Sequence, residues 1–178
     1  MNFKEILFAS PVIAAVNTEE DIEKALTSEC KVVFIIHSTL QNVKELVGLI
    51  KEADRIAIVH ADLVAGLSSK EVAIEFLLEQ TLADGIVSTK PQLIKKAIDM
   101  GRIGILRAFM IDTAAMETCK KQMELIKPDA VELMPGIVPR VFADMRAYSD
   151  MALIAGGLIR DKDDVIQAFD AGIDAVSA

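Results

Sequence analysis

Two consecutive glycines follow an apolar segment near the end of the chain. Residues 152–155 are Ala-Leu-Ile-Ala, Gly156 and Gly157 come next, and a helix is expected to start after them. Paired glycines let backbone N–H groups approach an anion, and the amides at a helix N-terminus attract negative charge. The pattern therefore predicts a phosphate-binding loop. In an eight-stranded α/β barrel the phosphate lies in the loops after the last two strands, and one short segment, 174–177, follows the glycines here.

His60 and Asp62 lie at the end of another apolar segment, with one residue between them. Side chains two apart on a strand point to the same face, so both are expected to face inward. They could contact a phosphate or a polyol, or act as a general base and the carboxylate that holds it. The structural alternative is a hydrogen-bonded pair that only closes the core.

Three further strand ends carry a charged side chain. Lys90, which precedes Pro91, could offset the charge of a phosphate or be a solvated loop lysine. Arg107 interrupts an apolar run, where a guanidinium is tolerated only when it is paired or holds an anion. Glu132 on the adjacent strand is the predicted partner, although its carboxylate could instead accept hydrogen bonds from ligand hydroxyls or act as a catalytic base. Gly136 turns the chain after this strand.

The histidines and carboxylates form no local metal-binding motif. His37, His60, Asp62 and Glu132 lack the HxH or HExxH spacing. We therefore predict no metal ion and no organic cofactor, and we expect the lone His37 to be an ordinary residue at the end of a strand.

Apolar segments alternate with helical patterns along the chain. A short helix is expected at 2–9, and strands are expected at 12–16, 31–36, 55–60, 85–88, 102–109, 130–134, 152–155 and 175–177. Strict alternation of strand and helix predicts a parallel sheet. Closing that sheet brings the polar strand ends to one mouth, whereas an open sheet spreads them over about 35 Å. We predict an α/β fold, a compact (β/α)8 TIM-like barrel with a short N-terminal helix and a missing or truncated eighth helix.

Composition narrows the class of protein. The chain has 178 residues, 52% of them hydrophobic, which predicts a single domain over 1–178. A net charge of −8 argues against nucleic-acid binding by overall attraction, so any RNA site must be a local basic patch. Cys30 and Cys119 lack CxxC spacing and are expected to be reduced thiols. No apolar run approaches the roughly 18 residues of a membrane helix, so we expect a soluble cytoplasmic protein.

Five segments occur in an order that is typical of one family. They are HADLVAGLS (60–68), ADGIVSTK (83–90), RAFMID (107–112), PDAVELMPG (128–136) and IAGGLI (154–159). In these segments the chain resembles the glycerol uptake operon antiterminator regulatory proteins. The resemblance implies a barrel-like fold that senses glycerol 3-phosphate and, when loaded, binds leader mRNA so that transcription passes a terminator. The chain departs from the family pattern after Ser177, where only Ala178 remains, and at Lys70, where an acidic residue is usual.

The leading hypothesis is a non-catalytic sensor without catalytic residues. In this hypothesis Gly156, Gly157 and Ser177 hold the phosphate, with Gly136 beside them. The glycerol hydroxyls contact His60, Asp62 and Glu132, and Arg107 and Lys90 add positive charge. The rival hypothesis is an aldolase, isomerase or lyase acting on a small sugar phosphate or phosphodiester, with Lys90 or Glu132 as base. Self-association into a homo-oligomer stays open, and the candidate RNA contacts are Lys95, Lys96, Lys120, Lys121, Arg140 and Arg146.

Overall fold

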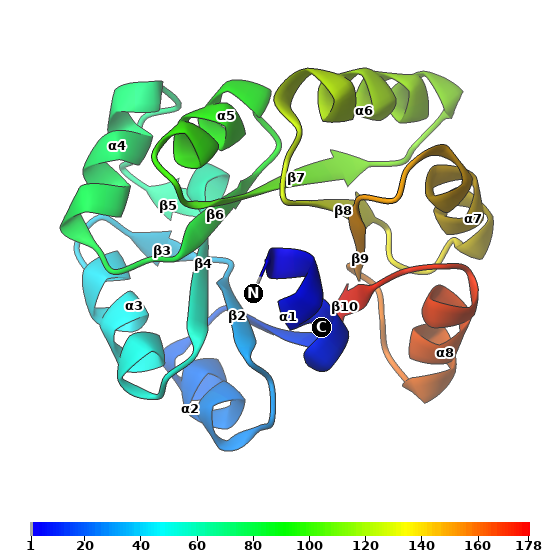
Figure 1. Cartoon of the computed structure of the whole chain (residues 1–178). Coiled ribbons are helices and arrows are strands. Elements are labelled where there is room, and N and C mark those ends of the chain that lie inside the picture. The colour runs from blue at the N-terminus through cyan, green and yellow to red at the C-terminus, as the bar shows by residue number, and fades with distance from the viewer. Residues whose placement is uncertain (1) are drawn as a thin grey trace.

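The computed structural model describes residues 2–178 and contains a closed barrel of eight parallel strands (Figure 1). Around the barrel the strands follow the order β1-β10-β9-β8-β7-β6-β4-β2. Their bounds are β1 Val12–Val16, β2 Val32–Ile35, β4 Ile56–His60, β6 Gly85–Ser88, β7 Ile103–Phe109, β8 Ala130–Met134, β9 Ala152–Gly156 and β10 Ala175–Ser177. Each of these eight barrel strands matches a predicted one with ends shifted by at most one residue. The predicted barrel is confirmed.

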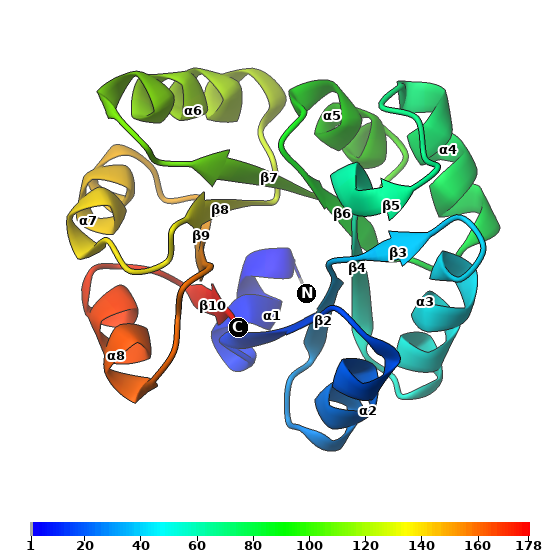
Figure 2. The same ribbon diagram turned by 180° about the vertical axis from the view of Figure 1, so that it is seen from behind.

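Helices form an outer ring around the strands, and one further helix precedes β1. The outer helices are α2 Glu19–Thr27, α3 Val43–Glu52, α4 Glu71–Gln80, α5 Pro91–Asp99, α6 Thr113–Ile126, α7 Pro139–Tyr148 and α8 Lys162–Asp170. Within residues 2–178 no helix follows β10. Both views show α1 (Phe3–Ala9) at the centre of the ring of strands (Figure 1, Figure 2).

The barrel interior is apolar and is closed at one end by α1. Asn2 caps this helix, because its side chain accepts a hydrogen bond from the Glu5 amide while the Glu5 carboxylate accepts one from the Asn2 amide. Phe3 and Leu7 are buried in a cluster with inward-facing strand residues such as Phe34. We call this the interior cluster; its other buried members are Ile13, Val32, Ile58, Val87, Ile105, Ala130, Ala152, Ile154 and Ala175. A second, outer cluster fills the space between strands and helices.

A second, two-stranded sheet lies beside the barrel and was not predicted. Ser38 and Thr39 form a short strand, β3, that pairs in parallel with β5 (Val64–Ala65) beside the barrel. The Thr39 amide donates to Asn42 Oδ1 at 2.8 Å, which turns the chain so that α3 begins only at Val43. Ser38 shares a face with Val64, a member of the outer cluster. Helix α4 begins after Lys70 without a side-chain cap.

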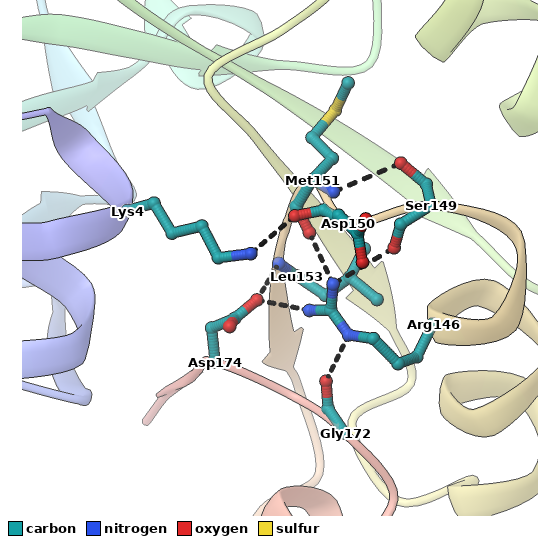
Figure 3. Close-up of polar contacts among 8 residues, drawn as sticks. All are labelled: Lys4, Arg146, Ser149, Asp150, Met151, Leu153, Gly172 and Asp174. Atoms are coloured by element: carbon teal, nitrogen blue, oxygen red, sulfur yellow. Dashed lines mark hydrogen bonds and ion pairs between the residues drawn. The ribbon is translucent and has the colours of Figure 1, made fainter.

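Arg146 joins several backbone segments at the end of the barrel opposite the mouth (Figure 3). Its guanidinium donates to the carbonyl oxygens of Gly172, Ser149 and Met151 at 2.9–3.0 Å. It also pairs with the Asp174 carboxylate, which accepts a hydrogen bond from the Leu153 amide. Figure 3 also shows Lys4 of α1 donating to the carbonyl of Asp150 in the same region.

Loss of this guanidinium is expected to destabilise the fold. Arg146→Ala removes four hydrogen-bonding contacts, so we expect the free energy of unfolding to fall by about 2 kcal/mol. Arg140→Ala on the same helix is the control, because Arg140 is exposed and forms no ion pair within residues 2–178. Urea denaturation of both variants is the measurement, and equal midpoints would contradict the prediction.

Candidate ligand site at the barrel mouth

A polar layer lies directly above the interior cluster at the carboxyl ends of the strands. Side chains alternate between the two faces of a strand, so a residue two positions after an interior residue also faces inward. Ile58 is followed by His60, and Ile105 is followed by Arg107. Ala130 and Ala175 are followed in the same way by Glu132 and Ser177, and all four polar residues are buried.

Glu132 is the centre of this layer. Arg107 lies directly opposite it in the β7–β8 register, and Arg107 Nε donates to Glu132 Oε2 at 2.5 Å. Ser177 Oγ donates to the other carboxylate oxygen at 3.0 Å. Gly156 leaves the space that the carboxylate occupies, because a Cβ at this glycine would lie 2.4 Å from Glu132 Oε1. The predicted Arg107–Glu132 pair is confirmed, and both carboxylate oxygens already accept a hydrogen bond.

Arg107 keeps donors that the protein does not use. Its Nη1 and Nη2 form no hydrogen bond within residues 2–178, and Glu132 fixes the guanidinium through Nε alone. A guanidinium presents its N–H groups in a planar fork that matches a phosphate or carboxylate. The pair therefore keeps two guanidinium nitrogens without a protein partner in the polar layer at the mouth of the barrel.

The prediction that Asp62 shares a strand face with His60 was wrong. It lies in a 3-10 turn, η1 (Ala61–Leu63), after β4 has ended. Its carboxylate accepts hydrogen bonds from Ser88 Oγ at 2.8 Å, from Thr89 N at 2.7 Å and from Thr89 Oγ1 at 2.9 Å, and Lys90 Nζ lies 3.0 Å away. Burial by itself raises the pKa of Asp62, but the hydrogen bonds from Thr89, Ser88 and Lys90 outweigh burial and hold that pKa below its ordinary value.

The loop after β9 differs from the one predicted. Helix α8 begins at Lys162, and Asp161 caps it by accepting hydrogen bonds from the amides of Asp163 and Asp164. The free amides lie earlier: those of 157–159 donate to no other group within residues 2–178. Gly157 and Leu158 both adopt left-handed conformations, with φ of 76° and 63°. An anion here would therefore bind the loop amides rather than the helix N-terminus.

Gly136 stands against this loop. Its amide donates to the carbonyl of Gly157 at 2.8 Å, and a Cβ at Gly136 would lie 3.0 Å from the backbone of Gly156. This close approach requires a residue without a side chain. Gly136 therefore supports the loop through its backbone.

His37 belongs to a different hollow. Its Nδ1 lies 2.8 Å from Asn17 Oδ1, and the two residues border a pocket of about 210 Å³. The pocket is also lined by Ile22 and Leu46 of the outer cluster, so it lies between the barrel and helices α2 and α3. The polar layer and this pocket are separate sites.

The family of the chain follows from comparison with known proteins. Residues 12–178 match the model of the glycerol-3-phosphate responsive antiterminator family. The chain belongs to this family. The match covers every strand of the barrel and all of the polar layer.

Two solved structures of the family have the same fold. The glycerol uptake operon antiterminator regulatory protein of Listeria monocytogenes is 33% identical, with a TM-score of 0.89 over 93% of this chain and 90% of that one. A glycerol uptake operon antiterminator-related protein of Thermotoga maritima is 30% identical, with a TM-score of 0.84 over 95% of this chain and 94% of that one. The uncharacterized protein YgcP of Escherichia coli is 37% identical over 177 residues, which cover 99% of this chain and 93% of YgcP.

Enzymes share the barrel at low sequence identity. Deoxyribose phosphate aldolase of Aeropyrum pernix is 14% identical, with a TM-score of 0.73 over 97% of this chain and 87% of that one. A likeness at this level shows the fold alone, because one barrel architecture carries unrelated chemistries.

Most of the candidate RNA contacts of this family member are already engaged. Arg146 is held by its hydrogen bonds at the end of the barrel opposite the mouth. Three lysines form ion pairs: Lys95 with Asp99, Lys96 with Glu75 and Lys120 with Glu117. Lys121 and Arg140 form no ion pair within residues 2–178.

No helix within residues 2–178 is long and apolar enough to cross a membrane. In the same range, no three His, Cys, Asp or Glu side chains gather where they could hold a metal ion.

Burial of His60 predicts a pH-dependent stability. Burial first, and the charge of Arg107 second, lower the pKa of His60 from 6.5 to about 4; His37 adds a small effect of the same sign, and Asp62 opposes it. Below the unfolded pKa the unfolded chain binds a proton that the folded chain does not, so stability falls as the pH drops from 6.5 toward 4. We expect His60 to account for a loss of about 2 kcal/mol between about pH 7 and pH 5.

The matched variant for this prediction is His60→Gln. It should lack this part of the pH dependence. Guanidinium unfolding at the two pH values is the measurement. Parallel losses of stability in the two proteins would contradict the assignment to His60.

Proposed function

We propose that this protein binds glycerol 3-phosphate at the barrel mouth and, when loaded, binds the leader mRNA of glycerol-metabolism genes so that transcription passes a terminator. The observation that carries the proposal is the fixed guanidinium of Arg107, whose Nη1 and Nη2 form no hydrogen bond within residues 2–178. Free amides lie two strands away, after β9, and Gly156 contacts the carboxylate that holds Arg107. Together these groups suit a phosphate ester.

Most of the charged and polar residues near the mouth then have a definite part. Arg107 and the amides after Gly156 and Gly157 hold the phosphate, and Gly136 supports their loop. Glu132 orients Arg107 by accepting a hydrogen bond from its Nε. Ser177 in turn holds the Glu132 carboxylate by donating to its other oxygen. Asp62 and Lys90 form an ion pair that shapes the loop after β6, and Lys90 Nζ, 35% exposed at the side chain, adds positive charge near the mouth.

A sensor role without turnover also agrees with the state of the charged groups. None of the eight barrel strands within residues 2–178 carries a lysine, so no strand places an amine beside the polar layer to form a Schiff base. Glu132 is bound to a guanidinium, and Lys90 is paired with Asp62. We expect NMR in heavy water to show no exchange of carbon-bound protons of glycerol 3-phosphate; exchange catalysed by the protein would favour an aldolase or isomerase instead.

Calorimetric titration tests the ligand. We expect micromolar binding of glycerol 3-phosphate, about −8 kcal/mol, and no measurable binding of glycerol. Arg107→Lys should weaken binding by about tenfold or more, because an ammonium cannot satisfy Glu132 and also offer a fork to the phosphate. Arg102→Lys, at the exposed opposite end of the same strand region, is the control. Equal affinities in wild type and Arg107→Lys would contradict the site.

Binding of RNA needs its own experiment. Filter binding of leader RNA should depend on glycerol 3-phosphate, and its affinity should fall with rising salt. RNA binding that is the same with and without the ester would contradict ligand control. The absence of RNA binding in both conditions would contradict the antiterminator part of the proposal and leave the ligand part standing.

A further inference from the structure

His60 carries a buried polar atom that the protein leaves unused at the mouth. The side chain is 3% exposed, and its Nδ1 has no hydrogen-bond partner within residues 2–178. Leaving a buried polar atom unpaired costs about 1–3 kcal/mol, so buried groups of this kind usually have a partner. The position of His60 suggests where that partner comes from.

Within residues 2–178 two other buried side-chain atoms also lack a partner, but neither lies on an inward-facing line of a barrel strand. Arg55 Nε stands just before β4, at the amino end of the barrel, where the guanidinium binds the carbonyls of Cys30 and Ser28. Ser38 Oγ is on β3 and shares a face with Val64 of the outer cluster. His60 alone of the three continues an inward-facing line, above Ile56 and Ile58.

The carboxylates of the site are poor candidates for binding further hydroxyl groups. Glu132 accepts hydrogen bonds from Arg107 and Ser177, one at each oxygen. Asp62 accepts from Ser88, Thr89 and Lys90. Among the three residues first assigned to the glycerol hydroxyls, only His60 retains an unused buried atom.

We propose that His60 is the specificity-determining residue of the site, and that its Nδ1 binds a hydroxyl of the ligand's carbon chain and so selects a hydroxylated phosphate ester over a plain alkyl phosphate. This inference rests on the proposed function. Burial of His60 and the nearby charge of Arg107 keep its imidazole neutral near pH 7, since they lower the pKa of His60 to about 4. A neutral ring nitrogen either donates to or accepts from a hydroxyl, depending on the tautomer.

Paired titrations with glycerol 3-phosphate and propyl phosphate test the inference, because the two esters differ by two hydroxyl groups. Wild-type protein should bind glycerol 3-phosphate at least about tenfold more tightly. His60→Phe should lower the affinity for glycerol 3-phosphate to that for propyl phosphate and leave propyl phosphate binding unchanged. His60→Gln, which restores a polar group, should recover part of the preference. His37→Phe, at the only other histidine, is the control and should change neither affinity.

The possible failures are distinct. A His60→Phe variant that keeps the preference would overturn the inference, with the unused nitrogen then binding only water. A variant that loses affinity equally for both esters would assign His60 a structural role and would also overturn the inference. Wild-type protein that binds neither ester would contradict the proposed function itself. Thermal unfolding of each variant confirms that the titrated protein is folded.

Discussion

Replacing Glu132 by alanine is expected to lower the free energy of unfolding by about 3–5 kcal/mol, the largest single effect in this protein. The substitution leaves the guanidinium of Arg107 buried without its carboxylate, and Ser177 loses its acceptor as well. Binding of glycerol 3-phosphate should be lost with it, because nothing then orients Arg107. Urea denaturation monitored by circular dichroism measures the first effect, and calorimetry measures the second.

A double variant separates the two effects of this substitution. Arg107→Met combined with Glu132→Leu removes both charges and fills the space with apolar groups, so most of the lost stability should return. Ligand binding should not return, because the donors for the phosphate are gone. If Glu132→Ala costs less than about 1 kcal/mol, water reaches the pair and our description of a dry, buried ion pair is wrong.

Substituting alanine for Gly156 is expected to have the second largest effect. The added Cβ would lie 2.4 Å from Glu132 Oε1, so the carboxylate must move away from Arg107 and Ser177. Overpacking of this kind costs about 3 kcal/mol at its upper range. We also expect affinity for glycerol 3-phosphate to fall by about 30-fold or more, because the ion pair that positions the phosphate donors is displaced.

Gly48→Ala is the matched control for this glycine. Gly48 lies within α3, and apart from its chain neighbours and the adjacent backbone of its own helix no atom lies within 4 Å of the position its Cβ would take. Alanine has the higher helix propensity, so this variant should gain up to about 1 kcal/mol and keep its ligand affinity. Chemical denaturation measures the stability of both variants, and calorimetry measures their affinity for glycerol 3-phosphate. A Gly156→Ala variant with wild-type affinity would show that ligand binding does not depend on the position of the Glu132 carboxylate.

Two residues near the mouth are better understood as supports than as ligands. The leading hypothesis assigned Asp62 a contact with ligand hydroxyls, yet its carboxylate holds Ser88, Thr89 and Lys90 in one loop. Glu132 was open to a role as catalytic base, yet it is bound to Arg107 and Ser177. In both cases the carboxylate is occupied by donors of the protein itself, which makes it a means of positioning cations.

The amino-acid sequence alone was enough to predict the barrel. Near-continuous apolar strands that alternate with amphipathic helices allow only a parallel sheet covered on both faces, and polar strand ends favour closure. The Arg107–Glu132 pair was also predictable, because a charge inside an apolar run needs a partner and the neighbouring strand offered one. These inferences depend on local pattern and on the order of the strands.

Other features were decided only by the tertiary structure. The β3–β5 pairing and the loop held by Asp62 join segments that are distant in sequence, and no local pattern marks them. Arg146 was a candidate RNA contact by charge alone, until the closed barrel placed three backbone carbonyls around it. The glycine loop was predicted, but its free amides precede α8 because Asp161 occupies the amides of the helix. Hydrogen-bond partners are chosen among groups that folding brings together, and their choice determines which polar atoms remain for a ligand.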